Sequence, residues 1–95
     1  MDRDKIEEIV IGCINDQIPK YKKILTSKEA KKKGYLGEED TRFQSDLGFD
    51  SLKTVELFLE CEKIFGITFT DDEIFKADTI NKLINKIQEK QQKNG

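Results

Sequence analysis

The residues best suited to chemistry are Asp50 and Ser51, in the stretch SDLGFDSLKTVELF between a glycine-containing segment and a strongly helical run. A serine there can be a nucleophile, an attachment point for another group or a helix cap. The chain contains no histidine, which excludes Ser-His-Asp triads, Cys-His pairs and His-ligated metals. No lysine is placed to serve Ser51 as a base. We therefore expect no catalytic residue, and Ser51 is left as a cap or an attachment point.

Residues that could hold a metal or form a disulfide lack the required spacing. The aspartates do not follow the alternating oxygen-ligand pattern of a calcium loop; those nearest the serine are Asp46, Asp50, Asp71 and Asp72. Cys13 and Cys61 each lie in an apolar helical pattern, so we expect two reduced core residues, as suits a cytoplasmic protein. The polar start MDRDKIEE does not resemble a secretory signal, and no apolar run is long enough to span a membrane.

Charge is distributed unevenly along the 95 residues, although the net charge is only -2. Residues 46–73 contain eight acids and two lysines, a local charge of -6, whereas residues 74–95 have a local charge of +3. The acidic block surrounds Ser51. We expect this face to attract basic protein partners and to repel nucleic acid.

Apolar periodicity and capping signals predict the helices. One helical face near the start of the chain is formed by Ile6, Ile9, Val10, Cys13 and Ile14. A second helix is expected over 51–65, before Gly66, and a capping box at 70–73 opens a short one. The last helix, capped by Asp78 or Thr79, has one apolar side formed by Ile80, Leu83, Ile84 and Ile87.

These elements predict an all-α fold, a small four-helix bundle of three main helices and one short helix with a long first loop. The loop, residues 19–50, includes a capping box at 26–29 and Gly34 as a natural C-cap, so a short surface helix is also expected there. We expect a single domain over residues 1–90 and a polar C-terminal tail over 91–95.

The helix expected over 51–65 carries two apolar stripes, although one is enough for packing in a small bundle. The first, suited to the core, consists of Leu57, Cys61, Ile64 and Phe65. The second consists of Leu52, Val55 and Leu59, with Glu56, Glu60 and Glu62 beside it. The second stripe can belong to a wider core or dock on another molecule.

The motif DLGFDSLKTVEL resembles the 4'-phosphopantetheine attachment motif of acyl carrier proteins. The resemblance runs without a gap from Phe43 to about Ile87, through CEKIFGITFTDDEI and ADTINKLI. It implies that Ser51 carries 4'-phosphopantetheine, transferred from coenzyme A, and that Asp50 helps to present the serine. The arm's thiol would hold acyl groups as thioesters, so the protein would be a carrier and not an enzyme.

The resemblance also implies contacts with partners and cargo. A phosphopantetheinyl transferase and acyl-processing enzymes with basic patches would bind the monomeric carrier at Leu52, Val55, Glu56, Leu59 and Glu60. The acyl chain would be lined by Leu57, Cys61, Phe65, Ile74, Ala77 and Ile80. Neither nucleic acid nor stable membrane insertion is expected.

Three departures from the family pattern affect the choice of pathway. Lys53 stands where fatty-acid carriers often have an acid, Thr70 stands where proline is common, and the first loop is longer than usual. They leave room for a specialised, polyketide-like acyl pathway beside fatty-acid biosynthesis. The main alternative is a non-carrier α-helical interaction domain in which Ser51 only caps a helix.

Overall fold

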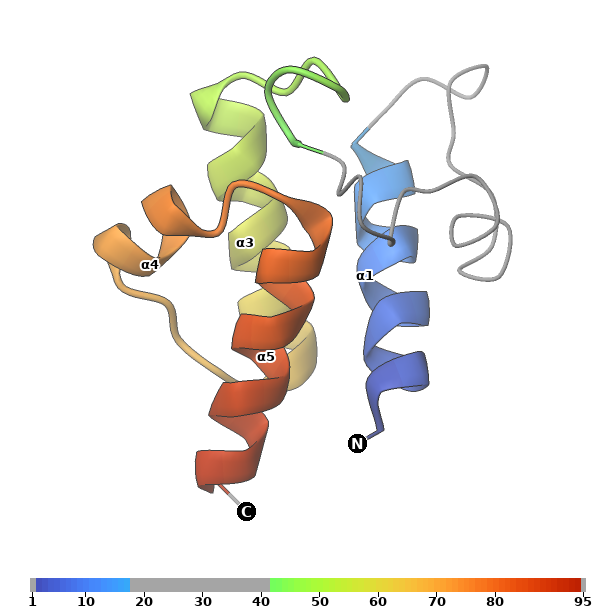
Figure 1. The fold of residues 1–95 in the computed structure, drawn as a ribbon, viewed down its shortest axis with the longest axis vertical. Coiled ribbons are helices and arrows are strands. Elements are labelled where there is room, and N and C mark those ends of the chain that lie inside the picture. Colours follow the sequence, from blue (N-terminus) through green and yellow to red (C-terminus); the bar gives the residue numbers. More distant parts are fainter. Residues whose placement is uncertain (1, 18–41, 95) are drawn as a thin grey trace.

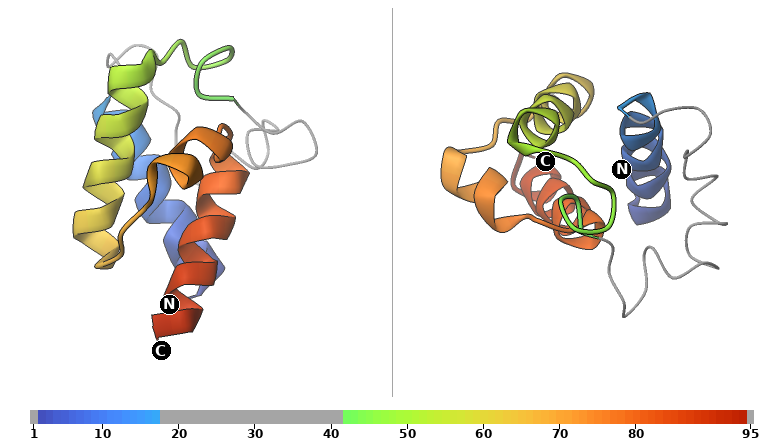
Figure 2. Two further views of the ribbon diagram at one scale, coloured as in Figure 1. Left: turned by 90° about the vertical axis from the view of Figure 1, so that its left-hand side faces the viewer. Right: turned by 90° about the horizontal axis from the view of Figure 1, so that it is seen from above.

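The computed structural model describes residues 2–17 and 42–94, and this part of the chain contains helices and no strand. In chain order the helices are α1 (Arg3–Asp16), α3 (Ser51–Phe65), α4 (Asp71–Lys76) and α5 (Ile80–Asn94). Figures 1 and 2 show α1, α3 and α5 side by side, with short α4 on the side remote from α1. The predicted all-α bundle is therefore confirmed.

Before each described helix, a capping side chain accepts a hydrogen bond from a backbone N–H of the first turn. The Asp2 carboxylate accepts from the Lys5 N–H at 2.8 Å before α1. Thr70 and Glu73 form the predicted reciprocal capping box before α4. The Thr79 hydroxyl accepts from the Lys82 N–H at 3.2 Å, which identifies Thr79, rather than Asp78, as the cap of α5.

Glycines permit the two sharp changes of direction around α3. Gly48 has a φ of 70° and Gly66 a φ of 66°, in the left-handed region that favours glycine. Gly66 ends α3 and donates its N–H to the Glu62 carbonyl at 2.9 Å. The residues after Gly66 connect α3 to α4.

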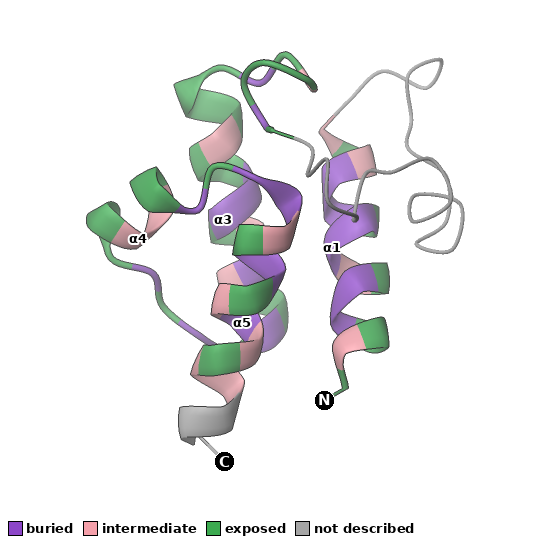
Figure 3. Ribbon diagram, in the orientation of Figure 1, coloured by how far each residue is buried: buried purple, intermediate pink, exposed green. Residues whose placement is uncertain are grey.

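The core lies between the facing sides of α1, α3 and α5, as the buried surfaces in Figure 3 show. All four apolar residues predicted for α5 are fully buried. Aromatic side chains from three segments extend this core. The Phe43 ring lies 6.1 Å from both the Phe49 and Phe58 rings, and the Phe58 ring lies 5.2 Å from that of Phe69.

One prediction about the core was wrong in detail. Ile64, assigned to the core stripe, is 49% exposed, and Phe58 is buried in its place. The segment that follows Gly66 brings Phe69 against Phe58, so the side of α3 that carries Phe58 is covered. In α1, Ile11 is buried, whereas Ile9 only packs partly against the core.

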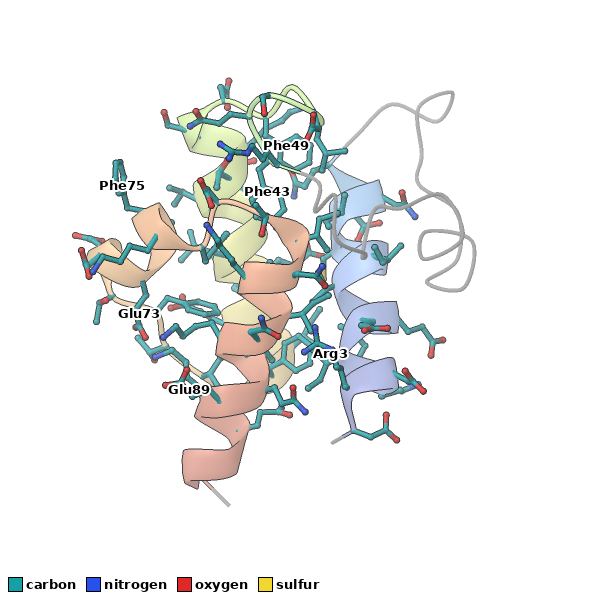
Figure 4. All side chains as sticks on the ribbon, in the orientation of Figure 1. Arg3, Phe43, Phe49, Glu73, Phe75 and Glu89 are labelled. Atoms are coloured by element: carbon teal, nitrogen blue, oxygen red, sulfur yellow. The ribbon has the colours of Figure 1, made fainter. Side chains whose placement is uncertain are left out.

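A polar seam joins α1 to α5 beside the core. The Arg3 guanidinium donates to Asn85 Oδ1 at 2.6 Å and to Gln88 Oε1 at 3.1 Å. Its Nε lies 3.3 Å from the Glu7 carboxylate. Figure 4 shows Arg3 reaching across from α1 toward α5. Glu7 is therefore a buried ion-pair partner and not a surface charge.

The first loop enters the described part at residue 42, where it packs on the start of α5. The Phe43 N–H donates to the Asp78 carbonyl at 3.1 Å, and Arg42 and Thr79 form an isolated antiparallel bridge. The short helix predicted over residues 26–34 lies outside the described residues. Within the described part, no helix is long and apolar enough to cross a membrane. Helix α5 continues to Asn94, through residues assigned to the predicted tail.

Candidate functional site

The segment before α3 is held in place by two phenylalanines. Phe43 and Phe49 are buried and stacked, and the Phe49 N–H donates to the Phe43 carbonyl at 2.8 Å. Gly48 turns the chain immediately before this anchor. The anchored turn presents Ser51 as the first residue of α3, with its side chain exposed to solvent. In Figure 4 both rings lie beneath this loop.

Asp50, and not Ser51, caps α3. The Asp50 carboxylate accepts from the Lys53 N–H at 2.8 Å, and the Asp50 carbonyl accepts from the Thr54 hydroxyl at 2.9 Å. The sequence left Ser51 open as a cap, and the structure assigns the capping role to Asp50. Ser51 is thus placed within the first turn, where free N–H groups and the helix dipole favour a negatively charged substituent.

The second apolar stripe of α3 faces solvent. Leu52 is 67% exposed, Val55 37% and Leu59 48%. Of the two alternatives that the sequence left open, this exposure excludes the wider core and agrees with docking on another molecule. Their predicted contact with partners stays a prediction.

The two acids predicted to contact partners have different surroundings. Glu56 is exposed, whereas Glu60 is half-buried at the contact between α3 and α1. Burial raises the pKa of Glu60, and its contact with the Asp16 carboxyl raises it further. Glu56 is therefore the better placed of the two to attract a partner from solution.

Five of the six predicted acyl-lining residues lie in the core, and Ile74 is half-buried. The five are Leu57, Cys61, Phe65, Ala77 and Ile80. A groove of about 590 Å³ lies beside Ser51. Of the six predicted acyl-lining residues, only Ile74 lines this groove. Its other lining residues are Arg42, Phe43, Gln44, Ser45, Ser51, Thr54, Val55, Asp71, Phe75 and Asp78.

The sequence reasoning missed Phe75 as a site residue. Phe75 lines the groove and is 86% exposed, while its neighbour Ile74 packs partly against the core. The signal was present in the sequence, because two adjacent large apolar residues on a six-residue helix cannot both face one core.

The prediction that both cysteines are core residues is confirmed. Cys13 and Cys61 are buried free thiols. A hydrogen bond with Cys13 and burial both raise the pKa of Cys61, which disfavours its reactive thiolate. In residues 2–17 and 42–94 no group of three or more acids or cysteines is arranged to hold a metal ion.

Comparison with known proteins gives consistent matches. A family model described as the phosphopantetheine attachment site matches residues 34–87, which include Ser51, α3 and α4. The acyl carrier proteins of Rickettsia canadensis (strain McKiel) and Rickettsia typhi (strain ATCC VR-144 / Wilmington) are each 39% identical over 88 residues. These alignments cover 93% of this chain and 88% of each relative. No solved structure gives a significant match.

The family match covers more than half of the chain, and the two relatives match nearly all of it. The chain therefore belongs to the acyl carrier protein family, as a carrier and not an enzyme, with acyl groups held as thioesters on a 4'-phosphopantetheine prosthetic group.

Proposed function

We propose that Ser51 is the attachment point for the 4'-phosphopantetheine arm. The observation that carries this assignment is that Ser51 is exposed at the start of α3 while Asp50 makes the capping hydrogen bond. The alternative, in which Ser51 only caps the helix, loses its support because that role belongs to Asp50. The attachment motif around Ser51 lies within the region that matches the family model.

The surroundings of Ser51 fit a phosphodiester. The substituent would face the N-terminal end of a 15-residue helix, where the helix dipole stabilises a negative charge by about 0.3–1 kcal/mol. Asp50 is held by Lys53 N–H and stays beside the serine for recognition by the transferase. The groove next to Ser51 offers the arm and its cargo a place to lie.

A phosphopantetheinyl transferase and the acyl-processing enzymes would dock on the exposed side of α3. Leu52, Val55 and Leu59 supply apolar contact there, and Glu56 and Glu60 are the nearby acids. Partners with an apolar surface rimmed by lysine and arginine fit this arrangement. We also propose a monomer in the cytoplasm that serves fatty-acid biosynthesis or a specialised, polyketide-like pathway.

The test is intact-mass measurement after incubation with coenzyme A and a phosphopantetheinyl transferase. The wild-type chain should gain one arm, and Ser51→Ala should gain none while keeping its helical circular dichroism. Ser45→Ala is the matched control, because Ser45 is an exposed serine six residues upstream that also lines the groove. It should still gain one arm. If Ser51→Ala gained the arm, the attachment site would lie elsewhere.

A further inference from the structure

Phe75 is the most exposed large apolar residue in the described part of the chain, at 86% exposure. Figure 4 shows its side chain projecting from α4, away from the interior. The fold does not use this ring, because Ile74 is the partly buried apolar residue of α4. A single exposed apolar side chain is ordinary, but Phe75 lies on the wall of an apolar groove.

The groove brings apolar residues from three segments together around Ser51. Phe75 and Ile74 come from α4, Val55 comes from α3, and Phe43 comes from the loop before α3. Phe43 is 1% exposed and packs against Phe49 and Phe58, so this part of the groove is firmly supported. Phe75, in contrast, has nearly all of its surface available to another molecule.

We propose that Phe75 is a specificity-determining residue that covers the hydrocarbon chain of the acyl cargo in this groove. The inference rests on the proposed attachment at Ser51. A group tethered there has a high effective concentration in the groove, because Ser51 itself lines it. The chemical class of cargo is an apolar acyl chain that extends beyond the thioester far enough to contact the ring.

The polar residues of the groove fit the remainder of the tethered group. Arg42, Asp71 and Asp78 line the groove and are exposed, so they can hydrogen-bond the amides of a pantetheine arm while the hydrocarbon contacts Phe75 and Val55. An acetyl group is too short to bury apolar surface against the ring. Longer chains should gain protection because burial of apolar area grows with chain length.

A partner enzyme is the competing occupant, because Val55 belongs both to the groove and to the exposed stripe of α3. The two occupants predict effects of Phe75 in different reactions. A cargo-covering ring protects the thioester in the isolated protein, whereas a partner contact changes only reactions that require the partner. The experiment therefore measures the loaded protein alone.

Wild type and variants are loaded with acetyl- or octanoyl-phosphopantetheine from the corresponding coenzyme A thioester. Loading is verified by intact mass. Hydroxylamine is then added; its nitrogen attacks the thioester carbonyl carbon, the carbon–sulfur bond breaks, and a hydroxamate and the free thiol form. The rate of acyl loss is followed by mass spectrometry and divided by the rate for the same acyl-pantetheine free in solution.

We expect the octanoyl thioester on wild type to react about fivefold more slowly than the acetyl thioester after this correction. Phe75→Ala should remove most of this difference by accelerating octanoyl loss, and Phe75→Leu should retain part of it. Ile64→Ala is the matched control, because Ile64 is 49% exposed and does not line the groove. It should behave as wild type. Acetyl loss should be the same in all four proteins.

Each contrary result has a distinct meaning. If wild type accepts no arm, the Ser51 assignment fails and this inference fails with it. If loading succeeds but octanoyl loss is equal in wild type and Phe75→Ala, the role of Phe75 is wrong and the attachment site stands. If Phe75→Ala slows loading by the transferase and leaves octanoyl protection intact, Phe75 is a partner contact and the cargo proposal is overturned.

Discussion

The Lys53 ammonium donates a hydrogen bond of 2.9 Å to the backbone carbonyl of Gln17, the residue that caps the C-terminal end of α1. The bond joins the first turn of α3 to the end of α1. A cation at a helix C-terminus is favourable because the last carbonyls are unpaired and carry the negative end of the dipole. Lys53 therefore has a structural role beside its place within the acidic surface.

Replacing Lys53 should separate these two roles. Lys53→Asp removes the bond to Gln17 and places a negative charge at the negative end of α1, but the same charge is favourable in the first turn of α3. We therefore expect the free energy of unfolding to fall by only about 0.5 kcal/mol. The same change should raise the association rate with a generic fatty-acid enzyme that has a basic docking surface. Urea unfolding and stopped-flow binding measure the two effects.

Lys53→Gln is the control for Lys53→Asp, because it removes the positive charge without adding a negative one. It should lose a similar amount of stability, because it also loses the bond to Gln17, and give a smaller rate increase. An unchanged association rate for Lys53→Asp would contradict the electrostatic role of this position.

The exposed stripe of α3 should matter for binding and little for stability. Val55→Gln should weaken interaction with the transferase or synthase while changing the free energy of unfolding by less than about 1 kcal/mol. Surface plasmon resonance and urea unfolding provide the two readouts. Ile64→Gln is matched in helix and in exposure, and lies on a different face of α3; it should leave binding unchanged. A stability loss of several kcal/mol in Val55→Gln would identify the stripe as core.

Association with the transferase should slow as salt rises, because exposed charges are screened over about 8 Å at physiological ionic strength. Glu56→Lys should slow association more than Glu8→Lys, an exposed charge on α1 outside the acidic block. Glu7 does not provide this control, since it is 4% exposed and paired with Arg3. Stopped-flow association rates at several salt concentrations measure the effect. Equal effects of the two substitutions, or rates independent of salt, would rule out steering by this face.

Glu73 should link stability to acid pH. Its carboxylate accepts from the Thr70 N–H at 2.9 Å and lies 2.9 Å from the Lys90 ammonium. These contacts lower the pKa of Glu73 from 4.5 to about 2. Because the folded-state pKa is depressed, the stabilisation is present above pH 4.5 and is lost as pH falls toward about 2. Figure 4 shows Glu73 between α4 and α5.

Glu73→Gln tests this linkage, since glutamine keeps an acceptor for Thr70 but loses the charge. At pH 7 the variant should be less stable than wild type by about 0.5–1.5 kcal/mol, and the difference should shrink below pH 4.5. Urea unfolding over this pH range measures it. Asp72→Asn is the control. Both side chains of the Asp72–Lys76 ion pair are exposed, so this pair should contribute little to the free energy of unfolding. A difference that does not change with pH would exclude the charge as its source.

Local patterns in the sequence were enough to predict the described helices and the approach to Ser51. Capping residues act on N–H groups two or three positions away, so the box at 70–73 and the left-handed glycines Gly48 and Gly66 could be read directly. The apolar side of α5 was also predictable, because its period is a property of one helix. The attachment motif around Ser51 is likewise a continuous stretch of sequence.

Tertiary structure decided which side of each helix is covered and which distant residues meet. Periodicity did not show that Phe58 is buried and Ile64 exposed. The burial of Phe58 depends on its contact with Phe69, which comes from the segment after α3. The contact between Lys53 and Gln17 joins residues 36 positions apart. The placement of Phe75 beside Ser51 depends in the same way on how α4 packs against α3. Spacing along a chain encodes contacts within a few helical turns, whereas burial and grooves depend on the packing of separate elements.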